Sequence, residues 1–102
     1  MLNINDYIDL VLTKKCMTRR DFCREINKIE EKLGEKKTNY QNITNYLNNN
    51  DDTHNIGYKM ALKMEKALNL PNDTLLNMVK LPLTGDAERE FNKMKEKVRN
   101  LW

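Results

Sequence analysis

The sequence has few of the residues that interrupt helices. Its 102 residues include two prolines and three glycines, and no stretch alternates polar with apolar residues over the length of a strand. Proline and glycine break helices, and strict alternation is the pattern of a half-buried strand. Because helix-breaking residues are few, the strand pattern is missing, and Leu, Met, Lys and Glu are frequent, we predict an all-α chain with one main domain.

The residues that build metal and catalytic sites are scarce as well. Cys16 and Cys23 are the only cysteines, and His54 is the only histidine. The cysteines have no further Cys or His at the spacing of a zinc site, and His54 has no partner of a catalytic set. We therefore predict no metal, no cofactor, no catalytic residue and a protein that is not an enzyme. We interpret both cysteines as small buried residues in a reducing compartment.

Long apolar runs are also missing. No run approaches the roughly 20 residues that a membrane-spanning helix needs. Asn3, Asp6 and Asp9 interrupt the apolar residues near the N-terminus, which is unlike a signal peptide. The sequence therefore predicts no membrane partner and a cytoplasmic location.

Charge is spread unevenly along the chain, whose net charge is +3. Residues 14–37 hold nine Lys or Arg against five Asp or Glu, whereas residues 38–50 hold no charged side chain. A basic segment attracts phosphate regardless of nucleic-acid sequence. This distribution favours a nucleic-acid partner more than the modest net charge does.

The uncharged segment 38–50 has the pattern of a short helix with one apolar side. Ile43, Tyr46 and Leu47 are spaced i, i+3 and i+4, and Thr38 or Asn39 can cap the start. The opposite side carries hydrogen-bonding groups without charge: Tyr40, Gln41, Thr44, Asn45 and Asn48. Such groups read base edges in the major groove of DNA. Since the chain holds 15 asparagines, composition alone is the alternative explanation of this face.

Five further helices are predicted from apolar spacing and capping signals. Thr18 and Asp21 resemble a capping box, and Gly34 is placed to end the helix that follows. In the fourth helix, Lys63 lies off the predicted apolar face together with its lysine neighbours. The predicted helices cover 4–14, 18–33, 55–69, a short stretch after Asp73 and a last helix from Asp86.

The last helix has an apolar stripe that needs a partner surface. The stripe consists of Phe91, Met94, Val98 and Leu101, with Trp102 beside it. An isolated helix of this length is marginal in water. The stripe therefore packs either on a second subunit or on the chain's own core. We predict a homodimer through these five residues and keep the second alternative open.

The order of these pieces resembles the Cro/CI-type, or XRE-like, helix-turn-helix domain of phage repressors. The resemblance covers residues 4–79. The matching segments are 17–23, 43–48, 60–70 and 73–76. The resemblance implies a five-helix fold whose third helix enters the major groove. We therefore expect a helix-turn-helix domain over 1–82 and a C-terminal amphipathic helix over 83–102, used for dimerisation or docking.

Two departures from the family pattern affect this expectation. The span from Thr18 to Ile43 is about ten residues longer than usual, so the second helix is lengthened and can be aligned from Thr18 or from Gly34. Both alignments give the same third helix, but they leave the orientation of the second helix open. Leu12 and Leu47 stand where many members pair an Arg with a Glu, so we predict an apolar contact there.

The resemblance also implies which residues face DNA. It implies base contacts for Tyr40, Gln41, Thr44 and Asn45. It implies phosphate contacts for Thr18 and Arg19, and the positive charge of the neighbouring segment extends that set. The predicted phosphate-contacting residues are Thr18, Arg19, Arg20, Lys36, Lys37, Asn39 and Asn48. An ordinary solvated surface is the alternative for the basic residues.

These features predict a sequence-specific DNA-binding transcription regulator, a repressor of a phage or other mobile element. The amides of Gln41 and Asn45 suit adenine, and the third helix has no Arg for guanine, so we expect an A·T-rich operator. The alternative function is a helix-turn-helix scaffold that binds protein, as an antitoxin-like partner or a phage inhibitor of a host enzyme. Protein binding would depend on residues 28–37 or on the helix 86–102.

Overall fold

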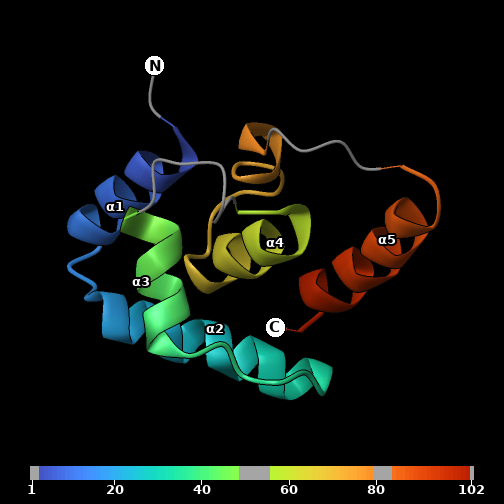
Figure 1. The fold of residues 1–102 in the computed structure, drawn as a ribbon, viewed down its shortest axis with the longest axis horizontal. Coiled ribbons are helices and arrows are strands. Elements are labelled where there is room, and N and C mark those ends of the chain that lie inside the picture. The colour runs from blue at the N-terminus through green and yellow to red at the C-terminus, as the bar shows by residue number, and fades with distance from the viewer. Residues whose placement is uncertain (1–2, 49–55, 80–83, 102) are drawn as a thin grey trace.

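The computed structural model describes residues 3–48, 56–79 and 84–101, and these residues form helices and turns without strands. The predicted all-α class is therefore confirmed for this part of the chain. The helices are α1 (Ile4–Lys14), α2 (Arg19–Leu33), α3 (Tyr40–Asn48), α4 (Tyr58–Ala67), the short 3-10 helix η2 (Leu76–Met78) and α5 (Asp86–Arg99) (Figure 1).

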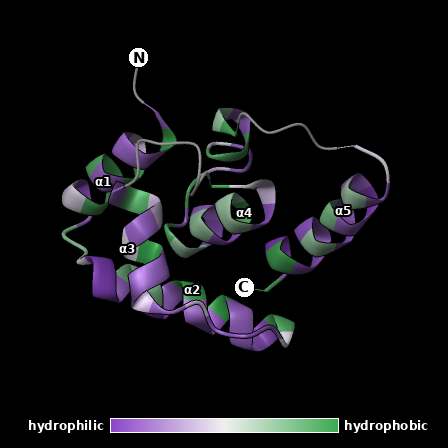
Figure 2. Cartoon of the chain, viewed as in Figure 1, coloured by the Kyte–Doolittle hydropathy of each residue, from purple (hydrophilic) through white to green (hydrophobic). Residues whose placement is uncertain are grey.

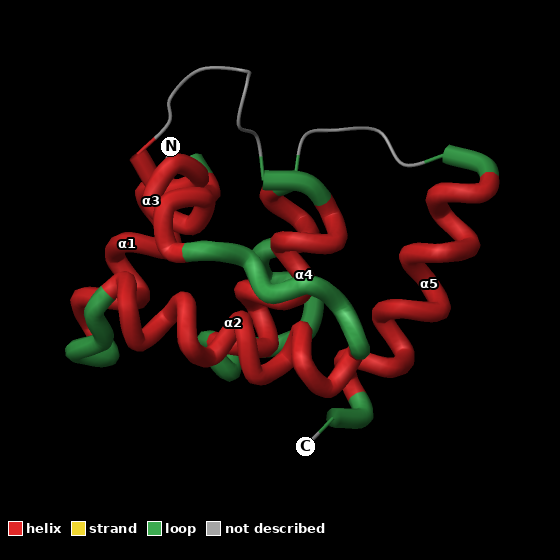
Figure 3. Tube along the Cα trace, turned by 60° about the horizontal axis from the view of Figure 1, so that its bottom comes forward, coloured by secondary structure: helices red, strands yellow, loops and turns green. Residues whose placement is uncertain are grey.

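The longest helix, α2, runs along one side of the molecule and contacts three others. α1 and α3 pack against each other at its N-terminal end, α4 lies in the middle, and α5 covers the opposite end (Figures 1 and 3). Each helix carries both apolar and polar residues, as Figure 2 shows. The apolar sides meet in one core, which includes Ile8, Phe22, Ile26, Ile43 and Met64, all fully buried.

The caps predicted at both ends of α2 are present, and α1 is capped as well. Thr18 and Asp21 form a reciprocal capping box at the start of α2, with distances of 3.0 and 3.1 Å between the paired backbone nitrogens and side-chain oxygens. Asn3 caps α1 through the backbone N–H of Asp6. Gly34 ends α2 with a φ of 72°, the left-handed conformation that glycine adopts without strain.

Two helices differ from the prediction. The fourth begins at Tyr58 and ends at Ala67, because Gly57 and Leu68 already have the backbone conformation of caps. The stretch after Asp73 consists of turns and η2, since Asp73 has a φ of 71° and the Glu65 carboxylate accepts the N–H groups of residues 73, 75 and 76. His54, Trp102 and the predicted boundary between 82 and 83 lie outside the described residues.

The apolar stripe of the last helix packs within the chain. Phe91, Met94 and Val98 are buried, and α5 contacts α4 and α2. The Phe91 ring lies edge-on to Tyr58 of α4, with ring centroids 5.6 Å apart. These three side chains thus follow the intramolecular alternative, and α5 in this position does not offer them as a dimer surface. Leu101 is half-buried against the same core.

Further sequence predictions concern an apolar contact, the burial of the cysteines and membrane spans. Leu12 and Leu47 are both buried in the common core where α1 packs on α3, as an apolar contact requires. The prediction that both cysteines are buried is wrong for Cys16, which is exposed in the turn after α1, where its φ is 56°. Among the described helices, none is long and apolar enough to span a membrane.

Candidate nucleic-acid interface

The connection between α2 and α3 sets the place of the candidate interface. α2 continues to Leu33, and residues 34–39 then run back along it before α3 begins (Figures 1 and 3). The carbonyl oxygen of Thr38 accepts a hydrogen bond from Asn27 Nδ2 at 2.9 Å, and Cys23 Sγ lies 3.7 Å from it. The start of α3 therefore lies beside the middle of α2, not beyond its end.

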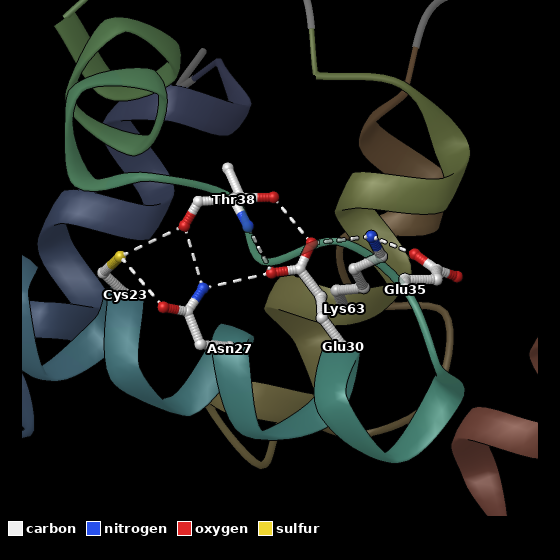
Figure 4. Close-up of polar contacts among 6 residues, drawn as sticks. All are labelled: Cys23, Asn27, Glu30, Glu35, Thr38 and Lys63. Carbon is white, nitrogen blue, oxygen red and sulfur yellow. Dashed lines mark hydrogen bonds and ion pairs between the residues drawn. The ribbon is translucent and has the colours of Figure 1, made fainter.

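A buried carboxylate holds this returning segment (34–39) in place. Glu30 is 1% exposed, and both of its oxygens accept hydrogen bonds from Thr38 (Figure 4). Glu30 Oε1 accepts the Thr38 N–H at 2.8 Å and Asn27 Nδ2 at 3.1 Å. Glu30 Oε2 accepts the Thr38 hydroxyl at 2.6 Å and the Lys63 ammonium at 3.0 Å. Lys63 also binds Glu35 at 2.6 Å, so α4 contacts the returning segment through an ion pair.

The electrostatics of this cluster favour the charged forms of both partners. Burial raises the pKa of Glu30, but hydrogen bonds from Thr38 and the charge and hydrogen bond of Lys63 outweigh it, so its pKa lies below the usual value. Burial lowers the pKa of Lys63, but the two carboxylates outweigh it, so its pKa is raised. Burial raises the pKa of the Cys23 thiol, and the Glu30 charge adds to this.

The outer side of α3 presents amides. Gln41 and Asn48 are exposed, and Asn45 is half-exposed. Gln41 Nε2 donates to Asn45 Oδ1 at 3.1 Å, one helical turn further on, so the two amides form a single polar unit on the surface. Both side chains keep unused amide groups for a partner outside the chain.

The other two predicted base-reading residues are placed differently. The Thr44 hydroxyl oxygen is buried and has no hydrogen-bond partner among the described residues, so it faces inward. Tyr40 is half-buried against the core, and its ring lies beneath the Arg20 guanidinium, 4.4 Å from ring centroid to Cζ. The structure thus brings together Gln41 and Asn45 but leaves the Thr44 hydroxyl inside.

The predicted phosphate-contacting residues surround α3, and two of them bind each other. Arg19 donates to Asn48 Oδ1 at 2.7 Å and pairs with Asp9 at 3.2 Å, which ties α2 to α3 and α1. Arg20 is exposed above Tyr40. Asn39 caps α3 by accepting the Asn42 N–H at 2.8 Å.

The remaining members of that set lie at the two ends of α2. Thr18 is exposed at its start, and its hydroxyl accepts the Asp21 N–H as the cap. Lys36 and Lys37 are exposed in the returning segment, with Lys37 3.9 Å from Glu31. The positive charges therefore flank α3 from its N-terminal side and from the start of α2.

Glu30 was not among the predicted site residues, and the predicted position of Lys63 was wrong. Lys63 was expected off the apolar face of its helix, yet it is 7% exposed. A signal was present, because Glu30 follows Ile26 by four residues and so lies on the apolar stripe of α2. Lys63 likewise lies on the Met60–Ala67 side of α4, at helical spacing. A charge on an apolar stripe indicates a buried partner.

Within the described ranges, no three His, Cys, Asp or Glu side chains are grouped as metal ligands would be. Comparisons of the chain with models of protein families, with curated proteins and with solved structures gave no match.

Proposed function

We propose that the protein is a sequence-specific DNA-binding transcription regulator whose helix α3 reads bases in the major groove. The observation that carries this proposal is the outward pair formed by Gln41 and Asn45 on a short helix without any charged residue. An amide that can donate and accept at once matches the N6 and N7 edge of adenine. An A·T-rich site therefore suits this helix.

The surroundings of α3 support the proposal. A helix that offers no charge of its own needs neighbouring cations for phosphate attraction. Arg20 is exposed at the start of α2, and Lys36 and Lys37 are exposed in the segment that leads into α3. The contacts of α3 with the first turns of α2, through Arg19 and Arg20, favour the helix-turn-helix alignment that starts at Thr18.

The position of α5 limits which surface could form a dimer. Because Phe91, Met94 and Val98 are buried within the chain, a dimer would have to use another surface. A single copy would read one half-site, whereas a two-fold dimer reads two half-sites about one helical turn apart. We propose that the bound copy acts as a repressor by covering its operator.

The direct test is selection of bound duplexes from a random pool by the purified protein, at two salt concentrations. We expect an enriched A·T-rich sequence, and Gln41→Ala combined with Asn45→Ala should reduce its preference over random duplex by roughly tenfold or more, since each good amide–adenine pair discriminates by about 1–3 kcal/mol. Asn77→Ala combined with Asn92→Ala removes two exposed amides on η2 and α5 and should leave the preference unchanged.

A protein-binding scaffold is the second candidate. It is favoured by an open hollow on the surface of α2, lined by Glu25, Lys28, Glu31 and Lys32. Mixed charges at such a surface suit a protein partner better than a phosphate backbone. Lack of any enriched duplex at either salt concentration would exclude the DNA-reading proposal and leave this one.

A further inference from the structure

We propose that Glu30 and Lys63 are positioning residues for α3, which fix its first turn and thereby aim Gln41 at the bases. This inference rests on the proposed DNA-reading function. Neither residue touches the outer side of α3, and both are buried. Their effect on binding would pass through Thr38, the last residue before the cap of α3.

The start of α3 needs such contacts because the connection between α2 and α3 is long. In a compact helix-turn-helix a turn of three or four residues holds the second helix close to the first. Here six residues, 34–39, separate α2 from α3 and have no regular secondary structure. A longer connection restricts the helix that follows it less, so other contacts must hold the start of α3.

Thr38 supplies these contacts through all of its polar groups. Its N–H and hydroxyl bind the two oxygens of Glu30, and its carbonyl oxygen binds Asn27 (Figure 4). The next residue, Asn39, caps the helix. Gln41 follows only two residues later, so a shift of Thr38 is passed directly to the base-facing amide.

Lys63 of α4 also holds the returning segment, through ion pairs with Glu30 and Glu35. A carboxylate that is 1% exposed needs a compensating charge, and the Lys63 ammonium supplies it at 3.0 Å. The same ammonium binds Glu35 near the start of the returning segment. The segment is thus attached to α4 near its beginning through Glu35 and near its end through Glu30 and Thr38.

The test uses a double variant, Glu30→Met with Lys63→Met. Replacing both members of the pair by apolar residues of similar size avoids leaving one buried charge without its partner. It removes the acceptors of the Thr38 N–H and hydroxyl, so some loss of stability is expected. The matched control is Lys59→Met with Glu90→Met, which removes an exposed ion pair of 3.7 Å between α4 and α5. Urea titration of both variants establishes that each is folded under the binding conditions.

The first measurement is the ratio of affinities for the selected duplex and for a random duplex at one salt concentration. For the double variant we expect this ratio to fall roughly tenfold, as when one base contact is lost, while affinity for random duplex stays within about twofold. The control should keep the ratio of the unmodified protein. An unchanged ratio in the folded double variant would overturn the proposal.

The second measurement does not involve DNA. Hydrogen exchange of the Asn42 amide reports the first turn of α3, because this amide is bound by the Asn39 cap. We expect it to exchange roughly tenfold faster in the double variant than in the control, with amides of α1 unaffected. If the unmodified protein selects no duplex, the proposed function fails. The Asn42 rate then decides separately whether Glu30 and Lys63 hold α3, and an unchanged rate would refute that.

Discussion

Buried and half-buried charged side chains of this protein hold backbone groups and neighbouring helices. Arg19 joins α2 to Asp9 of α1 and Asn48 of α3. Glu65 is 3% exposed and accepts three backbone N–H groups of residues 73–76, which would otherwise lack partners. Glu30 does the same for Thr38. Glu65 and Glu30 thus hold segments that lack a regular α-helix, whereas Arg19 joins neighbouring helices.

The lowered pKa of Glu30 has a consequence for acid stability. A carboxylate with a lowered pKa in the folded state contributes stability above its unfolded-state pKa and loses that contribution as pH falls through the folded pKa. We expect the free energy of unfolding to decrease progressively below about pH 4.5. In Glu30→Gln this decrease should be shallower, as followed by urea titration between about pH 6 and pH 3.

The control for this pH series is Glu25→Gln, a change of the half-exposed carboxylate on the same helix. The pKa of Asp21 is also lowered, mainly by its hydrogen bond with Thr18, and this adds the same acid dependence to every variant. The control should therefore parallel the unmodified protein. Equal slopes for Glu30→Gln and the unmodified protein would contradict the role assigned to Glu30.

These residues mark the limit of what the sequence could predict at this scale. The apolar stripe of α2 makes Glu30 conspicuous, but nothing local identifies Lys63 as its partner, 33 residues away. The side to which the Thr44 hydroxyl turns is equally hidden, because Thr44 lies between the buried and exposed sides of α3. The outward positions of Gln41 and Asn45 were predictable, since these residues are four apart on the side opposite Ile43 and Leu47.

At the scale of elements, the helices and their caps follow from local chemistry, but the connections do not. Apolar spacing was enough to predict the range of α1, and together with Thr18 and Gly34 it was enough to predict α2 with its ends. The path of residues 34–39 has no periodicity to reveal it, because it depends on Asn27, Glu30 and Lys63. The replacement of a fifth α-helix by η2 likewise depends on Glu65, from another helix.

The end of α2 offers a test at this scale. Gly34 has a φ of 72°, and a Cβ built there meets no atom within 4 Å, so alanine would be strained by its backbone and not by its neighbours. We expect Gly34→Ala to reduce the free energy of unfolding by about 1–2 kcal/mol. Gly34→Asn should cost less, since asparagine tolerates the left-handed conformation. Urea titration measures both.

Gly57→Ala is the matched control for that test. Gly57 also has open space around it, but its φ is −84°, which any residue adopts. Gly57 is the N-cap of α4, where alanine is less favourable than glycine, so its replacement should reduce the free energy of unfolding by about 0.5 kcal/mol, less than at Gly34. Similar losses at both glycines would show that removal of glycine itself, and not the left-handed φ, is responsible.

At the scale of the whole molecule, α5 shows why an amphipathic stripe does not identify its partner. Phe91, Met94 and Val98 need burial, and their spacing is the same whether a second subunit or the chain's own core provides it. In this protein α4 and the lengthened α2 cover these side chains within one chain. Arg99 then joins the end of α5 to Asp73 through a 2.9 Å ion pair. The extended α2 therefore contributes to the surface on which α5 packs.

The intramolecular position of α5 predicts how stability responds to concentration. A core confined to one chain unfolds with a midpoint that is independent of protein concentration, whereas a core shared between subunits gains stability as concentration rises. Val98 is fully buried, and Val98→Ala should reduce the free energy of unfolding by about 2 kcal/mol through lost burial and a residual cavity. We expect that loss to be the same over about a hundredfold range of concentration in thermal unfolding.

Leu10→Ala, at an exposed position of α1, is the control and should change little. A midpoint that rises with concentration, and a Val98→Ala effect that grows with it, would instead place α5 between two subunits, and the binding unit on DNA would then be a dimer reading paired half-sites.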